Sequence, residues 1–326
     1  MSIIVNLCLV NVKMYRHLYL YTISFLCCLH FAFSLCSSFS FSRKWATALR
    51  LRAWEHGEST YSWINPKLHQ RKNNTDLDQF KRIQFDGCGS VLILSEVGKI
   101  SLQRTGLSLW SAAYVMSYYI DEMWSQQGRR NRNENPKWTV LDLGAGLGLC
   151  SAVAAKHGMN VISTDIDSQA LVLLEENLER NCKKDSRISV HSLDWIASAE
   201  QADITTNPVF SEIEGYGGVD LIMLSDVIYS ATKPAWGAVI VLLEKLRIQR
   251  KNVEKKPLDS TDAPVGDPLV LLSYTQRRRD MSAQDEAEFF ALLRESGMEA
   301  DMVPSSQIPH GDTYMLTTLF KLRWLG

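Results

Sequence analysis

The sequence predicts an α/β domain, in which a mostly parallel β-sheet has helices on both faces and an antiparallel last strand. The first observation is that short apolar runs alternate with longer segments of helical spacing from Trp138 onward. The second is that the final segment, residues 313–324, alternates in the manner of an antiparallel strand. Strand and helix repeated in this way predict a parallel sheet covered on both faces. A chain of 326 residues has room for one such domain with an appendage, or for two small domains.

The individual elements follow from this alternation. The expected strands are residues 138–144, 160–165, 187–195, 219–226, 268–275 and 313–324. The expected helices are residues 109–124, 149–158, 168–181, 234–249 and 283–297. Gly158 and Gly297 are expected to end two of these helices, and Asp167 or Ser168 is expected to cap the start of a third.

Three segments do not follow the alternation. Residues 90–104 contain two apolar runs about a Glu-Val-Gly-Lys turn, which predicts a hairpin before the helix at 109–124. Two polar stretches, residues 198–218 and 250–267, interrupt the pattern further along. We expect both to be surface loops, the second of them disordered.

Residues 1–54 are interpreted as a hydrophobic and basic targeting or anchor segment. Residues 17–42 have no formally charged side chain, and residues 17–36 are about long enough to cross a bilayer as a helix. A signal anchor, a cleaved signal peptide, an organellar transit peptide and an untranslated start remain open. Anchoring through this helix, with its more basic flank following it, predicts a cytosolic domain, whereas a transit peptide predicts an organellar one. We interpret residues 55–80 as a linker and residues 81–326 as the folded domain.

The composition narrows the classes of function. The first 54 residues contain six Lys or Arg and no acidic residue, so the rest of the chain carries 29 basic and 36 acidic residues, a net charge of −7. An acidic domain argues against binding to a nucleic-acid backbone. The seven cysteines form no CxxC pair, and there is no His-rich cluster with metal-ligand spacing. We therefore expect neither a disulfide framework nor a metal site.

Three glycines follow the first predicted strand of the sheet in VLDLGAGLGLC, namely Gly144, Gly146 and Gly148. In open α/β sheets the ligand lies beyond the carboxyl ends of the strands, where backbone without side chains allows close approach. A dinucleotide-binding turn has the pattern GxGxxG, but the last of these positions is Leu149 here. The spacing GxGxG fits a ligand without a pyrophosphate, and a turn with no ligand is the simpler alternative.

Two further strand ends carry groups that suit a nucleoside. Asp165 ends the second strand about 20 residues beyond the glycines, where a carboxylate can accept hydrogen bonds from both ribose hydroxyls. Asp194 and Trp195 end the third strand and can accept from an adenine amino group and cover the adenine ring. Helix capping by Asp165 and an ordinary strand-end role for Trp195 are the simpler alternatives. Three successive strand ends that suit one nucleoside favour binding.

These stretches (VLDLGAGLGL, STDID and LDW), and above all LSDVIYS, resemble the seven-stranded S-adenosylmethionine-dependent methyltransferases. The closest resemblance is to family 16, which methylates protein lysines and has an Asp-x-x-Tyr motif, matched by Asp226 and Tyr229. The resemblance covers residues 85–322 and implies a Rossmann-like seven-stranded sheet and S-adenosylmethionine as cofactor. The residues that it implies for the cofactor are Trp110, Gly144, Ala145, Gly146, Asp165, Trp195 and Ser225.

The resemblance also implies a protein substrate with a lysine acceptor, and we expect no nucleic-acid partner and a monomer. A lysine amine must lose its proton before it can attack a methyl group. We expect Asp226 to orient this amine, and Tyr229 to pack its ring beside it and hydrogen-bond through its hydroxyl. The simpler alternative for these two residues is a strand-end cap and a space-filling ring.

The sequence departs from the family's pattern in three ways: Asp142 stands where the family more often has Glu, the two polar inserts are long, and the N-terminal extension is unusual. The stretch after the fifth strand is similar to the family's basic stretch there, and its arginines at 277–279 are interpreted as a solvated face, with substrate contact as the alternative. A methyltransferase for a small metabolite or other acceptor remains an alternative, as does a cofactor-binding adaptor without turnover.

Overall fold

The computed structural model describes residues 80–94, 105–128, 138–183, 186–252, 266–277 and 281–325. All of these residues belong to one structural unit of the chain. The predicted targeting segment, residues 1–54, lies outside the described residues. The same holds for the predicted linker except for its last residue, Phe80. Among the helices that are described, none is both long and apolar enough to cross a bilayer.

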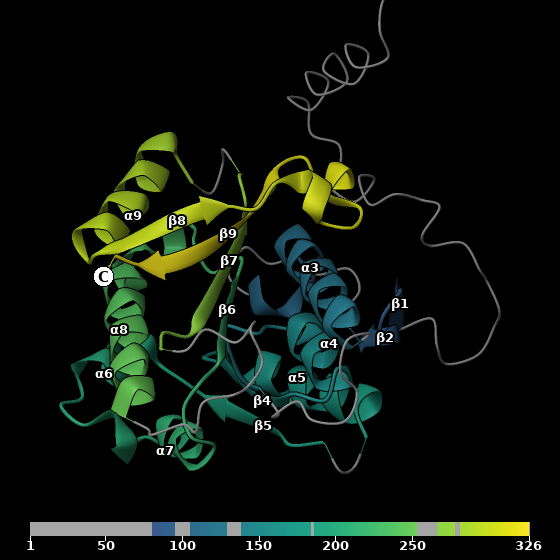
Figure 1. The fold of residues 1–326 in the computed structure, drawn as a ribbon, viewed down its shortest axis with the longest axis horizontal. Coiled ribbons are helices and arrows are strands. Elements are labelled where there is room, and N and C mark those ends of the chain that lie inside the picture. The colour runs from purple at the N-terminus through teal and green to yellow at the C-terminus, as the bar shows by residue number, and fades with distance from the viewer. Residues whose placement is uncertain are drawn as a thin grey trace, which may run out of the picture. The chain divides into compact units, whose positions relative to one another are not determined.

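A central sheet accounts for seven of the described strands. These strands are β3 (Thr139–Leu143), β4 (Asn160–Asp165), β5 (Ile188–Ser192), β6 (Leu221–Ser225), β7 (Leu269–Thr275), β8 (Met298–Met302) and β9 (Thr317–Trp324). Their spatial order is β5-β4-β3-β6-β7-β9-β8 (Figure 1). The first five strands of this order pair in parallel, whereas β9 is antiparallel to both β7 and β8. The predicted fold class, including its antiparallel last strand, is therefore confirmed.

Helices cover both faces of this sheet. One face carries α3 (Ser111–Gly128), α4 (Leu149–Lys156) and α5 (Ser168–Asn181), and the other carries α6 (Trp195–Glu200), α7 (Pro208–Gly215), α8 (Trp236–Asn252) and α9 (Ala283–Glu295) (Figure 1). Successive strand residues point to opposite faces, so Val140 belongs to the first core and Leu141 to the second. Because both faces of the central strands are buried, β6 has a continuous apolar run, LIML, instead of an alternating pattern.

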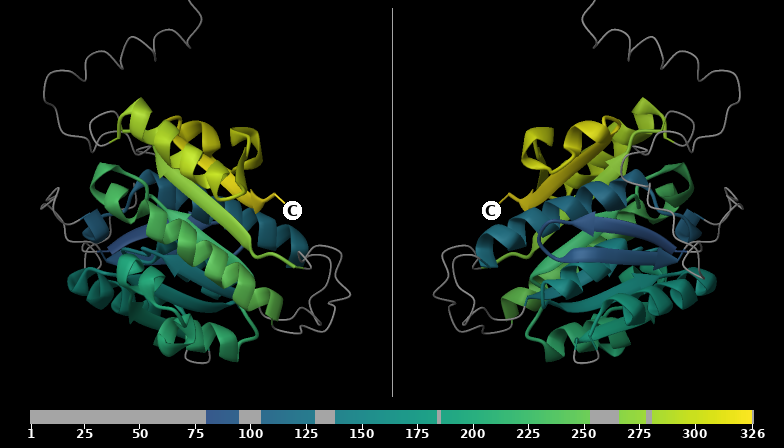
Figure 2. Two further views of the ribbon diagram at one scale, coloured as in Figure 1. Left: turned by 90° about the vertical axis from the view of Figure 1, so that its left-hand side faces the viewer. Right: turned by 90° about the vertical axis from the view of Figure 1, so that its right-hand side faces the viewer.

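A hairpin formed by β1 (Phe80–Phe85) and β2 (Gly89–Leu94) lies along α3, as the right-hand view of Figure 2 shows. The sequence predicted the second of these strands but paired it with residues beyond the turn at 96–99, which lie outside the described residues. In the described structure its partner is β1. Phe80, the last residue of the predicted linker, is the first residue of β1.

Asp121 of α3 ties this hairpin to the end of α4. Its carboxylate accepts hydrogen bonds from the backbone N–H groups of Gly87 and Cys88, each at 2.8 Å, and lies 2.8 Å from His157 Nε2. Potential metal-ligating atoms of Cys88, Asp121 and His157 consequently lie within 4.8 Å of one another. These nitrogens account for both carboxylate oxygens, so we interpret the cluster as a structural tie.

The prediction of a surface loop at residues 198–218 is wrong. Helix α7 lies within this stretch, with Asn207 accepting from the backbone N–H of Val209 as its N-cap and Pro208 in its first turn. Its apolar face, which includes Phe210 and Ile213, is buried against the sheet. The polar residues between these positions face outward and conceal the helical spacing.

Several element boundaries also differ from the predictions, and one strand was missed. Strand β5 ends at Ser192, because Asp194 caps α6 and Trp195 is the first residue of that helix. Helix α8 continues through Asn252, so the second predicted insert begins as a helix, and its residues 253–265 lie outside the described structure. Strand β8 was not predicted from the pattern.

Candidate functional site

A cavity of about 430 Å³ lies where the carboxyl ends of β3, β4 and β6 meet the start of α6. Ten of the eleven predicted site residues line it: Trp110, Gly144, Ala145, Gly146, Asp165, Asp194, Trp195, Ser225, Asp226 and Tyr229. Residues that are far apart in the sequence thus meet at one edge of the sheet. This is the edge at which ligands of open α/β sheets bind.

Gly148 is the predicted residue that does not line the cavity. Its φ of +78° lies in the left-handed region, and a Cβ atom there would come within 2.4 Å of Leu174 Cδ1 on α5. Gly148 is also the N-cap of α4. Its lack of a side chain therefore allows α4 to begin in close contact with α5.

The backbone N–H groups of the glycine turn after β3, residues 144–146, donate hydrogen bonds to other residues of the protein. Gly144 and Gly146 both have positive φ, and a Cβ atom on Gly144 would lie 3.2 Å from the Trp195 ring. The backbone N–H of Gly146 donates to Asp165 Oδ2 at 2.9 Å. In a dinucleotide-binding turn such backbone N–H groups face a phosphate. Here a carboxylate accepts this hydrogen bond, which disfavours a pyrophosphate ligand.

Asp165 retains capacity to bind a ligand. Besides the bond from Gly146, Asp165 Oδ1 accepts from the backbone N–H of Asp167 at 3.0 Å. A carboxylate offers about four acceptor positions, so further hydroxyl donors such as those of ribose can bind. Burial raises the pKa of Asp165 above its ordinary value. Asp167, as predicted, caps α5 by accepting from Gln169 and Ala170 N–H groups.

Asp194 and Trp195 lie side by side at the start of α6. Asp194 Oδ1 accepts from the backbone N–H groups of Ile196 and Ala197, at 2.9 and 3.1 Å. Because both bonds fall on Oδ1, the Oδ2 atom can still accept from a ligand. The Trp195 ring packs against Gly144. A carboxylate oxygen and a flat ring are thus next to each other at the cavity wall.

Asp142 is a buried carboxyl at the cavity wall that the sequence analysis did not assign to the site. Its Oδ2 atom accepts from Ser151 Oγ at 2.6 Å, whereas its Oδ1 atom has no hydrogen-bond partner among the described residues. Burial raises the pKa of Asp142 to about 7. An unpartnered buried acceptor in a cavity wall suits a ligand that brings a donor or a positive charge. The sequence feature that could have identified Asp142 is its position, one residue before the carboxyl end of β3.

Asp226 also lines the cavity and has an uncommon backbone conformation. Its φ is +57°, in the left-handed region that Asp and Asn tolerate better than most residues. Its carboxylate pairs with Arg277, with Nη1 to Oδ2 at 2.8 Å and Nη2 to Oδ1 at 3.1 Å. The guanidinium of Arg277 also lies over the Trp110 ring, 4.4 Å from its centroid. The solvated-face interpretation is therefore wrong for Arg277, while residues 278–280 lie outside the described structure.

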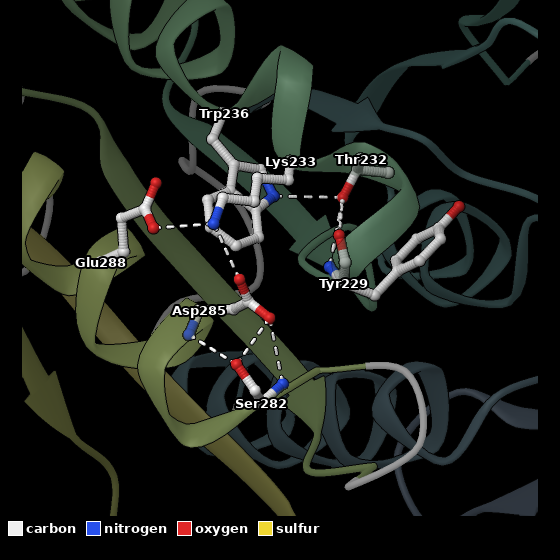
Figure 3. Close-up of polar contacts among 7 residues, drawn as sticks. All are labelled: Tyr229, Thr232, Lys233, Trp236, Ser282, Asp285 and Glu288. Atoms are coloured by element: carbon white, nitrogen blue, oxygen red, sulfur yellow. Dashed lines mark hydrogen bonds and ion pairs between the residues drawn. The ribbon is translucent and has the colours of Figure 1, made fainter.

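Tyr229 lies beside this pair and is held from both sides. Its hydroxyl is 2.9 Å from Thr105 Oγ1, in the 3-10 helix η4 (Thr105–Leu107). Its backbone N–H donates to Thr232 Oγ1 at 3.1 Å, in η6 (Ser230–Ala235), and Trp236 Nε1 donates to the same oxygen. Figure 3 shows the Tyr229 ring pointing away from this network. The backbone is thus fixed by η6, while the ring remains at the cavity.

The position of η6 depends in turn on α9. Lys233 Nζ lies 2.8 Å from Asp285 Oδ1 and 2.7 Å from Glu288 Oε2, and Ser282 caps α9 with Asp285 (Figure 3). Because Lys233 and Glu288 are well exposed, these ion pairs contribute modestly to stability. They connect the turn that carries Tyr229 to the rest of the second face.

The cavity is acidic. Among the described residues that line it, the charged side chains are Asp142, Asp165, Asp167, Asp194, Asp226 and Arg277. Five carboxyl groups against one guanidinium favour a cationic ligand and oppose a pyrophosphate. The fold and the site together define an α/β protein whose strand ends form an acidic cavity suited to a nucleoside-type ligand with a positive charge.

The comparisons with known proteins agree with this class. A family model described as lysine methyltransferase matches residues 90–253, and the chain belongs to this family. It is 33% identical over 149 residues to Protein N-lysine methyltransferase METTL21A of Xenopus tropicalis, a match that covers 44% of this chain and 61% of that protein.

Two further similarities were found. The chain is 30% identical over 198 residues to Protein N-terminal and lysine N-methyltransferase efm7 of Schizosaccharomyces pombe, covering 60% of this chain and 65% of that protein. The chain thus spans less than two thirds of the length of either relative. An S-adenosylmethionine-dependent methyltransferase from Agrobacterium tumefaciens has a crystal structure with 14% identity and a TM-score of 0.42, covering 80% of this chain and 75% of that one.

Proposed function

We propose that the protein is an S-adenosylmethionine-dependent methyltransferase that acts on lysine side chains of a protein substrate. The observation that carries the proposal is the acidic cavity, which is lined by the glycine turn, Asp165 and Trp195 together with Asp226 and Tyr229. Membership of the lysine methyltransferase family supports the same activity. The two relatives named above are both described as lysine methyltransferases.

The residues at the strand ends fit this cofactor. Asp165 is proposed to accept from the ribose hydroxyls, and Asp194 with Trp195 to hold the adenine. Asp142 is suited to the charged amino-acid end, because its Oδ1 atom has no partner among the described residues. When bound, S-adenosylmethionine supplies a methyl group that its sulfonium already activates, so the protein's contribution is mainly alignment.

The acceptor is proposed to enter beside Asp226 and Tyr229. A free lysine amine has a pKa of about 10.4, so most of it is protonated at neutral pH and lacks the lone pair that attacks. Removal from water lowers this pKa. Tyr229 is proposed to line the entry with its ring, since η6 fixes its backbone and Thr105 fixes its hydroxyl.

Residues 81–326 are proposed as the catalytic domain, with the segment at 1–54 serving its delivery. Either the domain is cytosolic and attached to a membrane through residues 17–36, or it is organellar after removal of a transit peptide. We propose that it acts as a monomer and binds no nucleic acid.

Methyl transfer is the direct test of this function. The full chain is incubated with tritiated S-adenosylmethionine and a protein extract, and labelled residues are located by mass spectrometry. Asp226→Asn tolerates the same left-handed backbone and removes the charge. We expect it to bind S-adenosylhomocysteine with an affinity near that of the wild type and to transfer methyl groups about 100-fold more slowly.

The labelled product separates the alternatives. Label on lysine supports the proposal, and label on a chain's α-amino group would instead match the second activity in the name of the efm7 relative. Label in small molecules alone favours a metabolite methyltransferase. Cofactor binding without any transfer favours an adaptor, and undiminished activity in Asp226→Asn removes Asp226 from the site.

A further inference from the structure

Arg277 lies two residues beyond the end of β7, and Asp226 directly follows the end of the neighbouring strand β6. Its guanidinium meets both carboxylate oxygens of Asp226, at 2.8 and 3.1 Å, and covers the Trp110 ring at 4.4 Å. Thr275 N–H donates to the same carboxylate at 3.2 Å. The Asp226 side chain is 2% exposed and that of Arg277 is 22% exposed. The pair is therefore a fixed feature of the cavity wall.

This pairing changes what Asp226 can do for an incoming amine. A lone carboxylate beside a lysine favours the ammonium form, which cannot attack a methyl group. A carboxylate neutralised by a guanidinium loses most of that effect, and the guanidinium itself disfavours a second positive charge nearby. The arrangement thus opposes the ammonium and favours the neutral amine.

We propose that Arg277 is a positioning residue that neutralises Asp226 and thereby lets the acceptor amine reach the methyl group in its uncharged form. This inference rests on the proposed function. Arginine suits the task better than lysine, because its planar fork matches a carboxylate with two hydrogen bonds and stacks on an aromatic ring. Trp110 supplies that ring and so holds the guanidinium in register with Asp226.

None of the other titratable groups among the described lining residues can disfavour the ammonium form as Arg277 does. Besides the pair itself, those among the described lining residues are Asp142, Cys150, Asp165, Asp167, Asp194 and Tyr229. All of these are acids, so each of them, when ionised, favours a bound cation. Among the described lining residues, Arg277 alone acts in the opposite direction.

The test is the pH dependence of methyl transfer in Arg277→Gln, measured with the full chain, tritiated S-adenosylmethionine and the acceptor protein first labelled in the extract. In the wild type the rate rises with pH until the acceptor is deprotonated. In the variant we expect this rise to move upward by about one pH unit, so that the rate is about tenfold lower on the acidic side and recovers at high pH. Arg277→Lys keeps the charge, so its rise stays at the wild-type pH even if its maximal rate falls.

Matched measurements separate this role from a structural one. Arg323→Gln removes an exposed arginine paired with Glu299 and Asp301 and leaves the profile unchanged. Thermal unfolding and S-adenosylhomocysteine affinity establish that each variant is folded, and Arg277→Met replaces the glutamine variant if the latter unfolds. Superimposable profiles, or a rate lowered equally at every pH, overturn the inference while the methyl-transfer activity stands. A wild type that labels no amine overturns the proposed function as well.

Discussion

At the scale of single residues, Asp142 shows how burial gives a side chain a pH-dependent effect. Its carboxyl is fully buried, and Ser151 is its hydrogen-bond donor in the described structure. Burial raises its pKa from 3.8 to about 7, since the charged form has lost its hydration. Between these two values the folded protein binds a proton that the unfolded chain does not bind. The stabilisation that results from this proton is fully present below the unfolded-state pKa of 3.8. It is lost as the pH rises through the folded-state pKa of about 7.

We therefore expect the free energy of unfolding to fall by on the order of 3 kcal/mol between about pH 4 and pH 7 through this one group. Asp142→Asn removes the titration, so its stability should depend less on pH over this range. Urea unfolding at a series of pH values measures both curves. Asp194→Asn is the matched control, because Asp194 is exposed and an amide can also cap α6. Equal pH dependence in the wild type and Asp142→Asn would contradict the assignment.

Whether a site residue could be predicted from the sequence depended on its position relative to the predicted strands. Asp165, Asp194 and Trp195 were found because each stands at or just beyond a strand end, where parallel strands bring ligand-binding groups together. Arg277 has the same placement after β7, but a run of three arginines is typical of a solvated surface and conceals a buried pair. The contact that identifies it, with Asp226, joins residues 51 positions apart.

At the scale of elements, the start of α4 depends on close packing against α5. Gly148→Ala combines an unfavourable positive φ with a Cβ atom 2.4 Å from Leu174, and we expect it to lower the free energy of unfolding by about 2–4 kcal/mol. Gly158→Ala is a matched control, because Gly158 also has positive φ but no neighbour within 4 Å of the added atom. It should cost about 1 kcal/mol.

Urea unfolding measures this difference, and titration with S-adenosylhomocysteine separates packing from ligand contact. Gly148→Ala should retain ligand affinity, because Gly148 does not line the cavity. A loss of affinity without a loss of stability would place Gly148 in the binding site instead.

Elements with complete local signals were predicted to the residue. Strand β4 and helix α5 have the predicted bounds, since a buried apolar run and a capped amphipathic helix each determine their own limits. Strand β8, with the sequence MEADM, carries two acidic residues and no β-branched residue, so its strand conformation comes from pairing with β9. Helix α7 was missed because its three buried apolar residues lie within a polar stretch.

At the scale of the whole molecule, the strand order decides where the site forms. The order reverses beside β3, with β4 on one side and β6 on the other, and the cavity lies at this switch point. Periodicity predicted which segments are strands but gave no information on their neighbours, because pairing depends on contacts far apart in the chain. The seven-stranded arrangement was expected from the family resemblance alone.

The central claim is that these strand ends together hold one molecule that combines adenosine with a positive charge. Calorimetric titration of the full chain with S-adenosylmethionine and, separately, with NAD⁺ tests it most directly. The acidic cavity and the hydrogen-bonded glycine turn predict one-to-one binding of S-adenosylmethionine and no binding of NAD⁺. They also predict loss of binding in Gly146→Arg, because even its Cβ atom would lie 3.2 Å from the Gly106 carbonyl oxygen at the cavity wall. Binding of NAD⁺ in preference to S-adenosylmethionine, or unchanged affinity in Gly146→Arg, would contradict the account.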